Sequence, residues 1–168
     1  MSAGDASGWG AMAETDPIFR RARRDDLDAL IAIFAADALG GHGDTTDPDM
    51  RPAYAAAMET ILASPSDRLY VGEIGGRVVA TAQLALVTAL PHRGRRRAIV
   101  EAVQVVAERR GLGIGAKLVA FLVEEARAGG AGVVELTSNA ARLDAHRFYE
   151  RLGFTKSHVG FKLPLDGG

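Results

Sequence analysis

The chain has 168 residues, which is enough for one domain with its own hydrophobic core, and its formal net charge is −1. A charge this close to zero gives no general attraction to nucleic acid or to an anionic membrane. The sequence contains no cysteine. That absence excludes disulfides, thiolate metal sites and a cysteine nucleophile.

Residues 1–14 are rich in Gly, Ala and Ser and lack the basic start and apolar run of a signal peptide. We expect a disordered leader here, followed by a single domain over residues 15–168. No segment approaches the run of about 18 apolar residues that a membrane span requires, so none is expected. A cytoplasmic location is the default expectation.

Hydrophobic periodicity and turn signals divide the first half of the domain into alternating elements. Asp47 and Pro48 are typical of a helix N-cap and its first residue, and Gly75-Gly76 is typical of a hairpin turn. The predicted elements are a strand over 17–22, helices over 27–38 and 48–63, paired strands over 68–74 and 77–90, and a basic loop over 91–97.

The second half predicts a strand over 98–106, a helix over 113–128, a strand over 133–137, a helix over 143–152 and a last strand over 154–163. A strand–helix–strand unit implies a right-handed crossover and parallel pairing of its two strands. The predicted fold class is therefore α+β in three layers, with a mixed, mostly antiparallel twisted sheet and helices on both faces.

The most informative segment lies between the strand at 98–106 and the helix that follows it. Gly111, Gly113 and Gly115 alternate along a loop that leads into that helix. Glycines let a backbone approach a ligand closely, and a helix N-terminus offers free N–H groups and the positive end of its dipole. This combination predicts an anion site, most often for phosphate.

Two phosphate-binding motifs fit this segment poorly. A nucleoside-triphosphate loop needs a hydroxyl residue after its lysine, but Leu118 follows Lys117. A dinucleotide fingerprint is formally present as Gly111, Gly113 and Ala116. It follows an antiparallel hairpin, however, and leaves too little sequence for a doubly wound half. Dinucleotide binding remains a minor alternative.

Two motifs resemble the GNAT N-acetyltransferase superfamily. Arg110-Gly111-Leu112-Gly113-Ile114-Gly115 is similar to the signature R/Q-x-x-G-x-G/A, and Ala145-His146-Arg147-Phe148-Tyr149-Glu150-Arg151-Leu152-Gly153-Phe154 looks like its second motif. Their order and separation, and the order of the predicted elements, are also those of the family. The resemblance covers residues 18–163 and implies acetyl-coenzyme A as cosubstrate.

By this resemblance, backbone N–H groups of the glycine loop hold the coenzyme pyrophosphate, and Arg110 shapes the loop or adds charge. Main-chain groups of Val105 and Val106 pair with the pantetheine arm, where two strands separate. The residues expected in the pyrophosphate site are Arg110, Gly111, Leu112, Gly113, Ile114, Gly115 and Ala116.

The resemblance also implies that Tyr149 is the general acid, donating its phenol proton to the leaving thiolate. The alternative is an aromatic side chain that packs beside Phe148 on a helix face. Both interpretations stay open here, and the matched motif favours the functional one.

Glu101 is the candidate general base, because it interrupts an apolar strand where burial would raise the pKa of its carboxyl group. Two-residue alternation places it on one strand face with Val103 and Val105. An ion pair with an arginine from 95–97 is equally consistent with the sequence.

Many family members carry Asn seven residues before the tyrosine, but Arg142 stands there and Asn139 lies three residues earlier. Either of the two is expected near the coenzyme. Without cysteine a cysteinyl acyl-enzyme cannot form, so direct transfer to the amine is expected. The four histidines lack metal-ligand spacing, and no metal is expected.

The expected acceptor is a small primary amine, with a protein amine as second choice, bound by residues 40–54 and 90–97. Nucleic-acid binding is not expected, because aromatic residues do not interleave the basic run. A homodimer is an open alternative, since family members often dimerise. An alternative of a different functional class also stays open: a non-catalytic acyl-coenzyme A sensor on the same fold.

Overall fold

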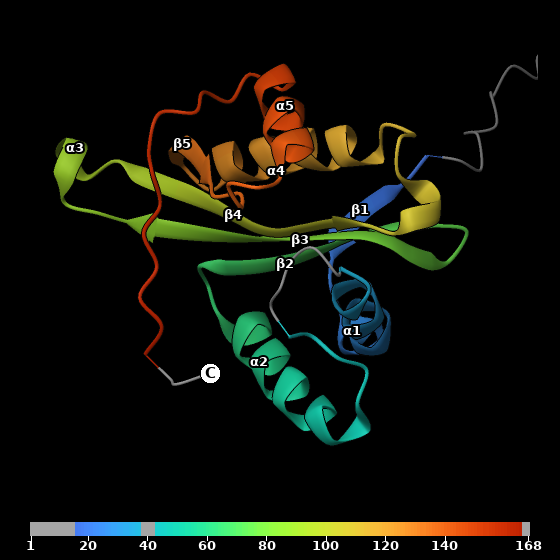
Figure 1. Cartoon of the computed structure of the whole chain (residues 1–168). Coiled ribbons are helices and arrows are strands. Elements are labelled where there is room, and N and C mark those ends of the chain that lie inside the picture. Colours follow the sequence, from blue (N-terminus) through green and yellow to red (C-terminus); the bar gives the residue numbers. More distant parts are fainter. Residues whose placement is uncertain (1–15, 38–42, 166–168) are drawn as a thin grey trace, which may run out of the picture.

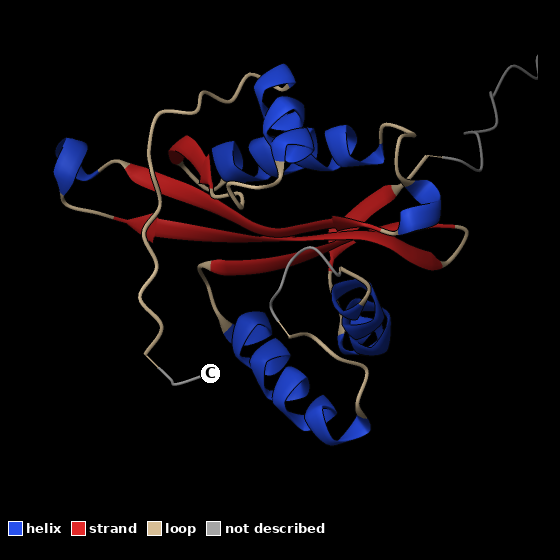
Figure 2. Cartoon of the chain, viewed as in Figure 1, coloured by secondary structure: helices blue, strands red, loops and turns tan. Residues whose placement is uncertain are grey.

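One sheet of five strands forms the centre of the computed structural model, which describes residues 16–37 and 43–165 (Figure 2). Its strands, in spatial as well as chain order, are β1 (Ile18–Arg21), β2 (Asp67–Ile74), β3 (Arg77–Thr88), β4 (Arg96–Val105) and β5 (Ala131–Leu136). All neighbours are antiparallel except β4 and β5, which are parallel. The predicted mixed, mostly antiparallel sheet is confirmed. The leader expected over residues 1–14 lies outside the described residues.

Helices cover both faces of this sheet (Figure 1). Helices α1 (Leu27–Ala35) and α2 (Arg51–Ala63) lie on one face, and α4 (Ile114–Ala128) and α5 (Leu143–Arg151) on the other. The short turn α3 (Pro91–Gly94) lies at the tip of the hairpin formed by β3 and β4. The predicted three-layer arrangement is therefore confirmed.

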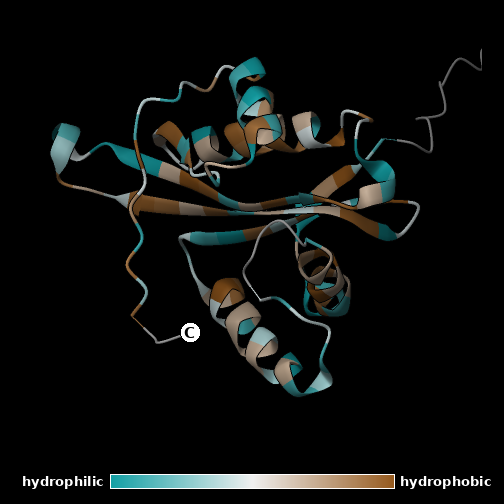
Figure 3. Cartoon of the chain, viewed as in Figure 1, coloured by the Kyte–Doolittle hydropathy of each residue, from teal (hydrophilic) through white to brown (hydrophobic). Residues whose placement is uncertain are grey.

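Each layer of helices packs on the sheet through its own hydrophobic cluster. On one face, Leu118 and Leu122 of α4 pack against Leu84 of β3, and all three are fully buried. On the other face, Leu30 of α1 and Met58 of α2 pack against β2. The apolar side of α4 faces the sheet, whereas α5 is largely hydrophilic (Figure 3). The sheet is thus a rigid platform on which α4 is fixed and α5 is held by fewer apolar contacts.

Short 3₁₀ turns precede three of the elements, at Arg24–Asp26, Pro48–Met50 and Ala107–Arg109. The Asp47 side chain accepts a hydrogen bond of 3.0 Å from the backbone N–H of Asp49, and Pro48 is the first residue of the turn before α2. The predicted N-cap is confirmed. The helix predicted to reach residue 38 ends earlier, at Ala35.

The strand predicted over 154–163 is wrong. Residues 154–165 contain no strand, and within the described residues β5 pairs only with β4. Val159, Phe161 and Leu163 alternate as in a strand, but their side chains are 79%, 94% and 83% exposed. Alternation alone does not make a strand, and nothing in the described part of the chain covers the apolar side of this segment. Gly160 also weakens any extended pairing.

Candidate active site

A β-bulge in β4 sets the geometry of the candidate site. Thr81 of β3 pairs with Gln104, and Gln83 pairs with Glu101, so Ala102 and Val103 together oppose a single residue of β3. Ala102 has a φ of 51°, in the left-handed region. The extra residue shifts the alternation of side chains along β4 by one position.

Strands β4 and β5 stop pairing just before the bulge. Their register runs from Arg96 opposite Ala131 to Val100 opposite Leu136, and the remaining residues of β4 have no partner on β5. The N–H of Val106 donates to the carbonyl of Val79 on β3, at 2.9 Å. Because backbone groups alternate along a strand, the N–H and C=O of Val105 point away from β3 and into this opening.

The glycine loop lies directly after the opening. Gly111 and Gly113 have φ values of 77° and 81°, and no atom lies within 4 Å of the position that a Cβ would occupy on either residue. The backbone conformation requires glycine at these two positions, and the space beside them is open. Leu112 between them is 63% exposed, so its side chain does not fill that space.

Helix α4 presents free donors to the same space. Gly113 is its N-cap and accepts a hydrogen bond of 3.1 Å from the N–H of Lys117. The N–H groups of Ile114, Gly115 and Ala116 precede the first bond of the helix and therefore have no partner within it. Together with the positive end of the helix dipole, these groups suit a phosphate or pyrophosphate.

Arg110 fixes the loop to the strand. Its Nε donates to the carbonyl of Val105 at 2.9 Å, across the opening side of β4. Of the two roles expected for Arg110, this contact supports the shaping of the loop. It also means that the carbonyl of Val105 already accepts one hydrogen bond.

Helix α5 lies across the opening and is held at both of its ends. Phe148 packs against the first turn of α4, where its Cζ lies 3.4 Å from the Cβ position of Gly115. At the other end, Arg142 is the N-cap residue, and its Nη1 lies 3.6 Å from Oδ2 of Asp37. A Cβ at position 115 would make ordinary van der Waals contact with Phe148, so the third glycine allows α5 to lie close to α4 without being the one residue that fits there.

Tyr149 lies in an aromatic group between Phe148 and Phe154, with ring centroids 5.1 Å and 5.8 Å away. Burial raises the pKa of the Tyr149 phenol above its ordinary value, while the positive charge of Arg142 acts in the opposite direction. The phenol is therefore protonated at neutral pH and able to donate a proton. Tyr149 can thus pack against Phe148 and also donate a proton, so the two interpretations of this residue are compatible.

The expected burial of Glu101 is wrong, because this residue is exposed. The placement on one face with Val103 and Val105 is also wrong. The bulge at Ala102 turns those two valines towards the α4 cluster, where Val100 also packs. Glu101 lies on the opposite face, towards α1. Within the described residues it forms no ion pair, since Arg97 pairs with Glu135 instead.

Sequence reasoning missed a polar cluster on this α1 side of β4. Gln104 donates from Nε2 to Oδ2 of Asp37 at 2.5 Å, and the same carboxylate lies near Arg142. Asp37 follows the end of α1, and its side chain is 11% exposed. The cluster joins α1, β4 and α5. A polar Gln within an apolar strand was the signal available, as it was for Glu101.

Asn139 has a structural role in this geometry. Its Oδ1 accepts from the N–H of Ala141 at 2.9 Å, and its carbonyl accepts from the N–H of Arg142 at 3.0 Å. Nε2 of His146 lies 2.9 Å from the same carbonyl. These bonds form the turn that starts α5, so Asn139 orients Arg142.

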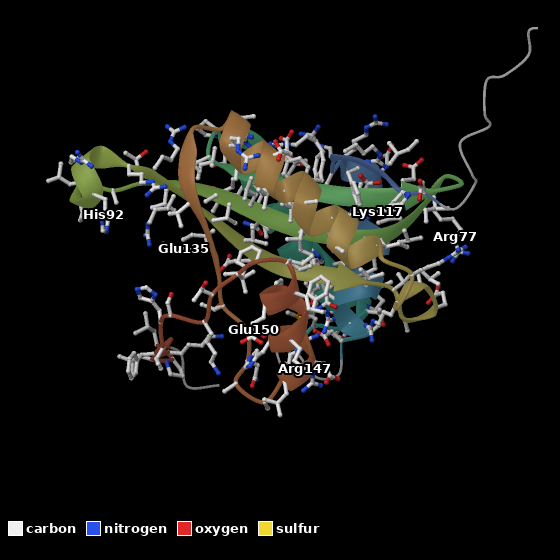
Figure 4. The ribbon with its side chains drawn as sticks, turned by 90° about the horizontal axis from the view of Figure 1, so that it is seen from above. Arg77, His92, Lys117, Glu135, Arg147 and Glu150 are labelled. Atoms are coloured by element: carbon white, nitrogen blue, oxygen red, sulfur yellow. The ribbon has the colours of Figure 1, made fainter. Side chains whose placement is uncertain are left out.

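The basic run lies away from the site. Arg96 is six residues from Ala102 along an extended strand, a distance of about 20 Å. In Figure 4, His92 lies at the opposite end of the molecule from Lys117, which is in the first turn of α4. Arg96 donates to the carbonyl of Gly129 at 2.9 Å, so it supports the turn before β5. The other loop expected to bind the acceptor, residues 40–54, falls partly outside the described residues.

The sequence profile of the acetyltransferase (GNAT) family matches residues 27–154, which is most of the chain. The chain belongs to the GNAT acetyltransferase family. The resemblance inferred from the two motifs is thus confirmed. In the described part of the chain, no helix is long and apolar enough to cross a membrane, and no three His, Cys, Asp or Glu residues gather as a metal site would require.

Two curated relatives match part of this GNAT chain. An aminoalkylphosphonate N-acetyltransferase from Salmonella typhimurium is 43% identical over 90 residues, which cover 54% of this chain and 58% of the relative. An uncharacterized N-acetyltransferase from Bacillus subtilis is 39% identical over 90 residues, covering 51% of this chain and 63% of the relative. The match therefore spans less than two thirds of either relative.

Solved structures of the same fold cover almost the whole domain. A protein from Bacillus halodurans described as a transcriptional regulator superposes with a TM-score of 0.85 at 32% identity, covering 89% of this chain and 99% of that one. A putative acetyltransferase from Agrobacterium tumefaciens gives a TM-score of 0.76 at 28% identity, covering 88% and 99%. Glucosamine-6-phosphate N-acetyltransferase from Arabidopsis thaliana shares the fold, with a TM-score of 0.74 at 19% identity and 89% and 99% coverage.

Proposed function

We propose that this GNAT protein is an acetyl-coenzyme A-dependent N-acetyltransferase that moves the acetyl group directly to a primary amine of a small molecule. The observation that carries the proposal is the position of α5 across the opening between β4 and β5. Its Phe148 touches the first turn of α4, and its N-cap Arg142 reaches the Asp37–Gln104 pair. Tyr149 follows Phe148 on this helix, with the two ring centroids 5.1 Å apart, which supports a place for Tyr149 near the proposed donor site.

The residues of the glycine loop fit the coenzyme pyrophosphate. Open space lies beside Gly111 and Gly113, and three N–H groups at the start of α4 lack helical partners. The N–H of Val105 points into the opening, where it suits an amide of the pantetheine arm or the thioester carbonyl. Val106 is less suited, because its N–H donates to Val79.

Bound acetyl-coenzyme A supplies a thioester, and the amine nitrogen bonds to its carbonyl carbon as the carbon–sulfur bond breaks. An alkylamine has a pKa of about 10, so its ammonium must first lose a proton at neutral pH. Glu101 takes that proton, through water because it is exposed to solvent. Tyr149 donates its phenol proton to the leaving sulfur.

Release of free thiol in the presence of a panel of amines tests the proposal. Tyr149→Phe and Glu101→Gln are each expected to lower kcat about 100-fold, since a positioned acid or base contributes about 10²–10⁴-fold. Both variants keep their thermal stabilisation by acetyl-coenzyme A. Tyr70→Phe and Glu135→Gln are the matched controls. They remove the same chemical groups elsewhere in the fold: a phenol hydroxyl that bonds to Glu125 and a carboxylate that pairs with Arg97. Full activity in both test variants would reject the assigned roles.

A second candidate is a non-catalytic acyl-coenzyme A sensor, which the likeness to a structure described as a transcriptional regulator favours. Binding of the coenzyme does not separate the two functions. Thermal stabilisation by acetyl-coenzyme A, with no amine that accelerates thiol release, would establish the sensor instead. Stabilisation by NAD but not by acetyl-coenzyme A would overturn both.

A further inference from the structure

A groove between α1, α2 and the sheet has no role in the acetyl donor site. It has a volume of about 100 Å³, and most of its lining is apolar, with Leu30, Phe34, Ala57 and Met58 among the residues that form it. No Lys, Arg, Asp or Glu side chain lines it. Figure 1 shows the two helices that form its walls below β2 and β3.

Gln83 of β3 is the polar residue at the sheet side of this groove. It pairs directly with Glu101 of β4 in the register of the sheet. Side chains of residues paired in this way lie on one face, with Cβ atoms about 5 Å apart. The groove therefore ends beside the proposed general base.

The groove also has the polarity of a site for part of a ligand. Tyr54 is the other polar residue in its lining, and its hydroxyl group is engaged outside the groove: it donates to Asp44 at 3.0 Å and accepts from the N–H of Thr45 at 3.0 Å. Beyond Glu101 on the same face of β4 lies Gln104, which holds the Asp37 carboxylate. Because Arg142 lies 3.6 Å from the Asp37 carboxylate, Glu101 is the carboxylate of this face that forms no ion pair within the described residues. An apolar groove that ends beside it suits a cation with an apolar body.

We propose that this groove binds the apolar body of the acceptor and that the preferred acceptors are primary alkylamines of about four carbons. The inference rests on the proposed N-acetyltransferase function and names its substrate class. A cavity of about 150 Å³ accommodates benzene, so the present volume holds a group somewhat smaller than benzene. The ammonium end then lies beside Glu101.

This acceptor class differs from the substrate in the name of the Salmonella relative, an aminoalkylphosphonate. A phosphonate needs a cationic partner, and the groove lining has none. Arg96 at the start of β4 is about 20 Å from the bulge. Arg142 is nearer, but it is engaged with the Asp37 carboxylate at 3.6 Å. A short amine with an anionic tail is therefore a poor fit for this groove.

The experiment measures kcat/KM by thiol release for ethylamine, propylamine, butylamine, pentylamine and hexylamine, and for 2-aminoethylphosphonate. Each methylene that enters the groove gains about fourfold, so butylamine exceeds ethylamine by roughly 16-fold. The increase stops or reverses after about four or five carbons, when the groove is full. The phosphonate is the poorest acceptor.

Ala57→Leu fills the groove and is paired with Ala56→Leu, the neighbouring exposed alanine of α2 that does not line it. The Ala57 variant loses about tenfold in kcat/KM for butylamine, within the range for one group in an apolar pocket, and remains within about twofold for ethylamine. The Ala56 variant changes neither. The alkylamine series on the unaltered protein tests the inference independently of how either variant folds.

A flat chain-length series, or a preference for the phosphonate that Ala57→Leu does not change, would overturn this inference and leave the N-acetyltransferase function standing. If no amine accelerates thiol release while acetyl-coenzyme A stabilises the protein, the proposed function fails and the inference fails with it. The two failures are therefore distinguishable.

Discussion

Replacement of Gly113 by alanine separates the backbone requirement of the glycine loop from its role in binding. Gly113 has a φ of 81° and nothing within 4 Å of its Cβ position, so alanine meets no steric clash there. The left-handed conformation costs an L-residue about 1–2 kcal/mol. For a domain of this size each kcal/mol lowers Tm by about 2–4 °C, so we expect a fall of roughly 2–8 °C.

The methyl group also projects into the space assigned to the pyrophosphate. We expect it to displace the pyrophosphate from one backbone N–H. Loss of that hydrogen bond to a charged group weakens coenzyme A binding about tenfold or more, as measured by isothermal titration calorimetry. Gly130→Ala is the matched control, because its φ is 77° and its Cβ position is equally open, but it follows the other end of α4. Both variants lose stability. Equal coenzyme affinity in both would refute the placement of the pyrophosphate at Gly113.

Three stability predictions follow from buried or strained positions. Leu118→Ala removes a fully buried side chain of α4 and costs about 2–5 kcal/mol in urea unfolding, whereas exposed Ala56→Leu changes stability little. Asp26→Asn breaks the pair with Arg20, whose guanidinium lowers the pKa of Asp26, and costs about 1.5–3 kcal/mol at pH 7, the range for a hydrogen bond to a charged group. Because the folded pKa lies below the ordinary 3.8, this difference is complete above that pH and disappears as pH falls through the folded value; a constant difference would contradict the assignment. Ala102→Val places a β-branched residue at a φ of 51° and loses more stability than Ala102→Gly, which relieves the strain.

The sequence was sufficient for the elements whose signals are local. Asp47 and Pro48 define the start of a helical turn by a hydrogen bond between neighbouring residues, and Gly75-Gly76 forms a hairpin turn because both glycines adopt positive φ. The glycine loop before α4 is local in the same sense. Each of these conformations depends on residues that are adjacent in the chain, so their types are enough to predict them.

Features that depend on distant contacts were not predictable in this way. Residues 154–163 have the alternation of a strand, yet pairing requires an edge in the right place, and β5 pairs only with β4 within the described residues. Asp37 fell within the helix predicted over 27–38, with no sign of a role beyond it. Its contacts with Gln104 and Arg142 lie 67 and 105 positions away in the chain and exist only because α1, β4 and α5 converge.

The bulge at Ala102 is a local irregularity with long-range effects, because it changes the face of the sheet on which each later residue of β4 lies. Without it, two-residue alternation would place Glu101 on one face with Val103 and Val105, as the sequence suggested. With it, those valines pack beneath α4 while Glu101 and Gln104 share the opposite face with the groove. The pairing of β4 with β5 ends at Val100, two residues before the same irregularity. A single extra residue in β4 thus places Val103 and Val105 on the α4 side of the sheet and leaves Glu101 on the α1 side, where we propose that the acceptor binds.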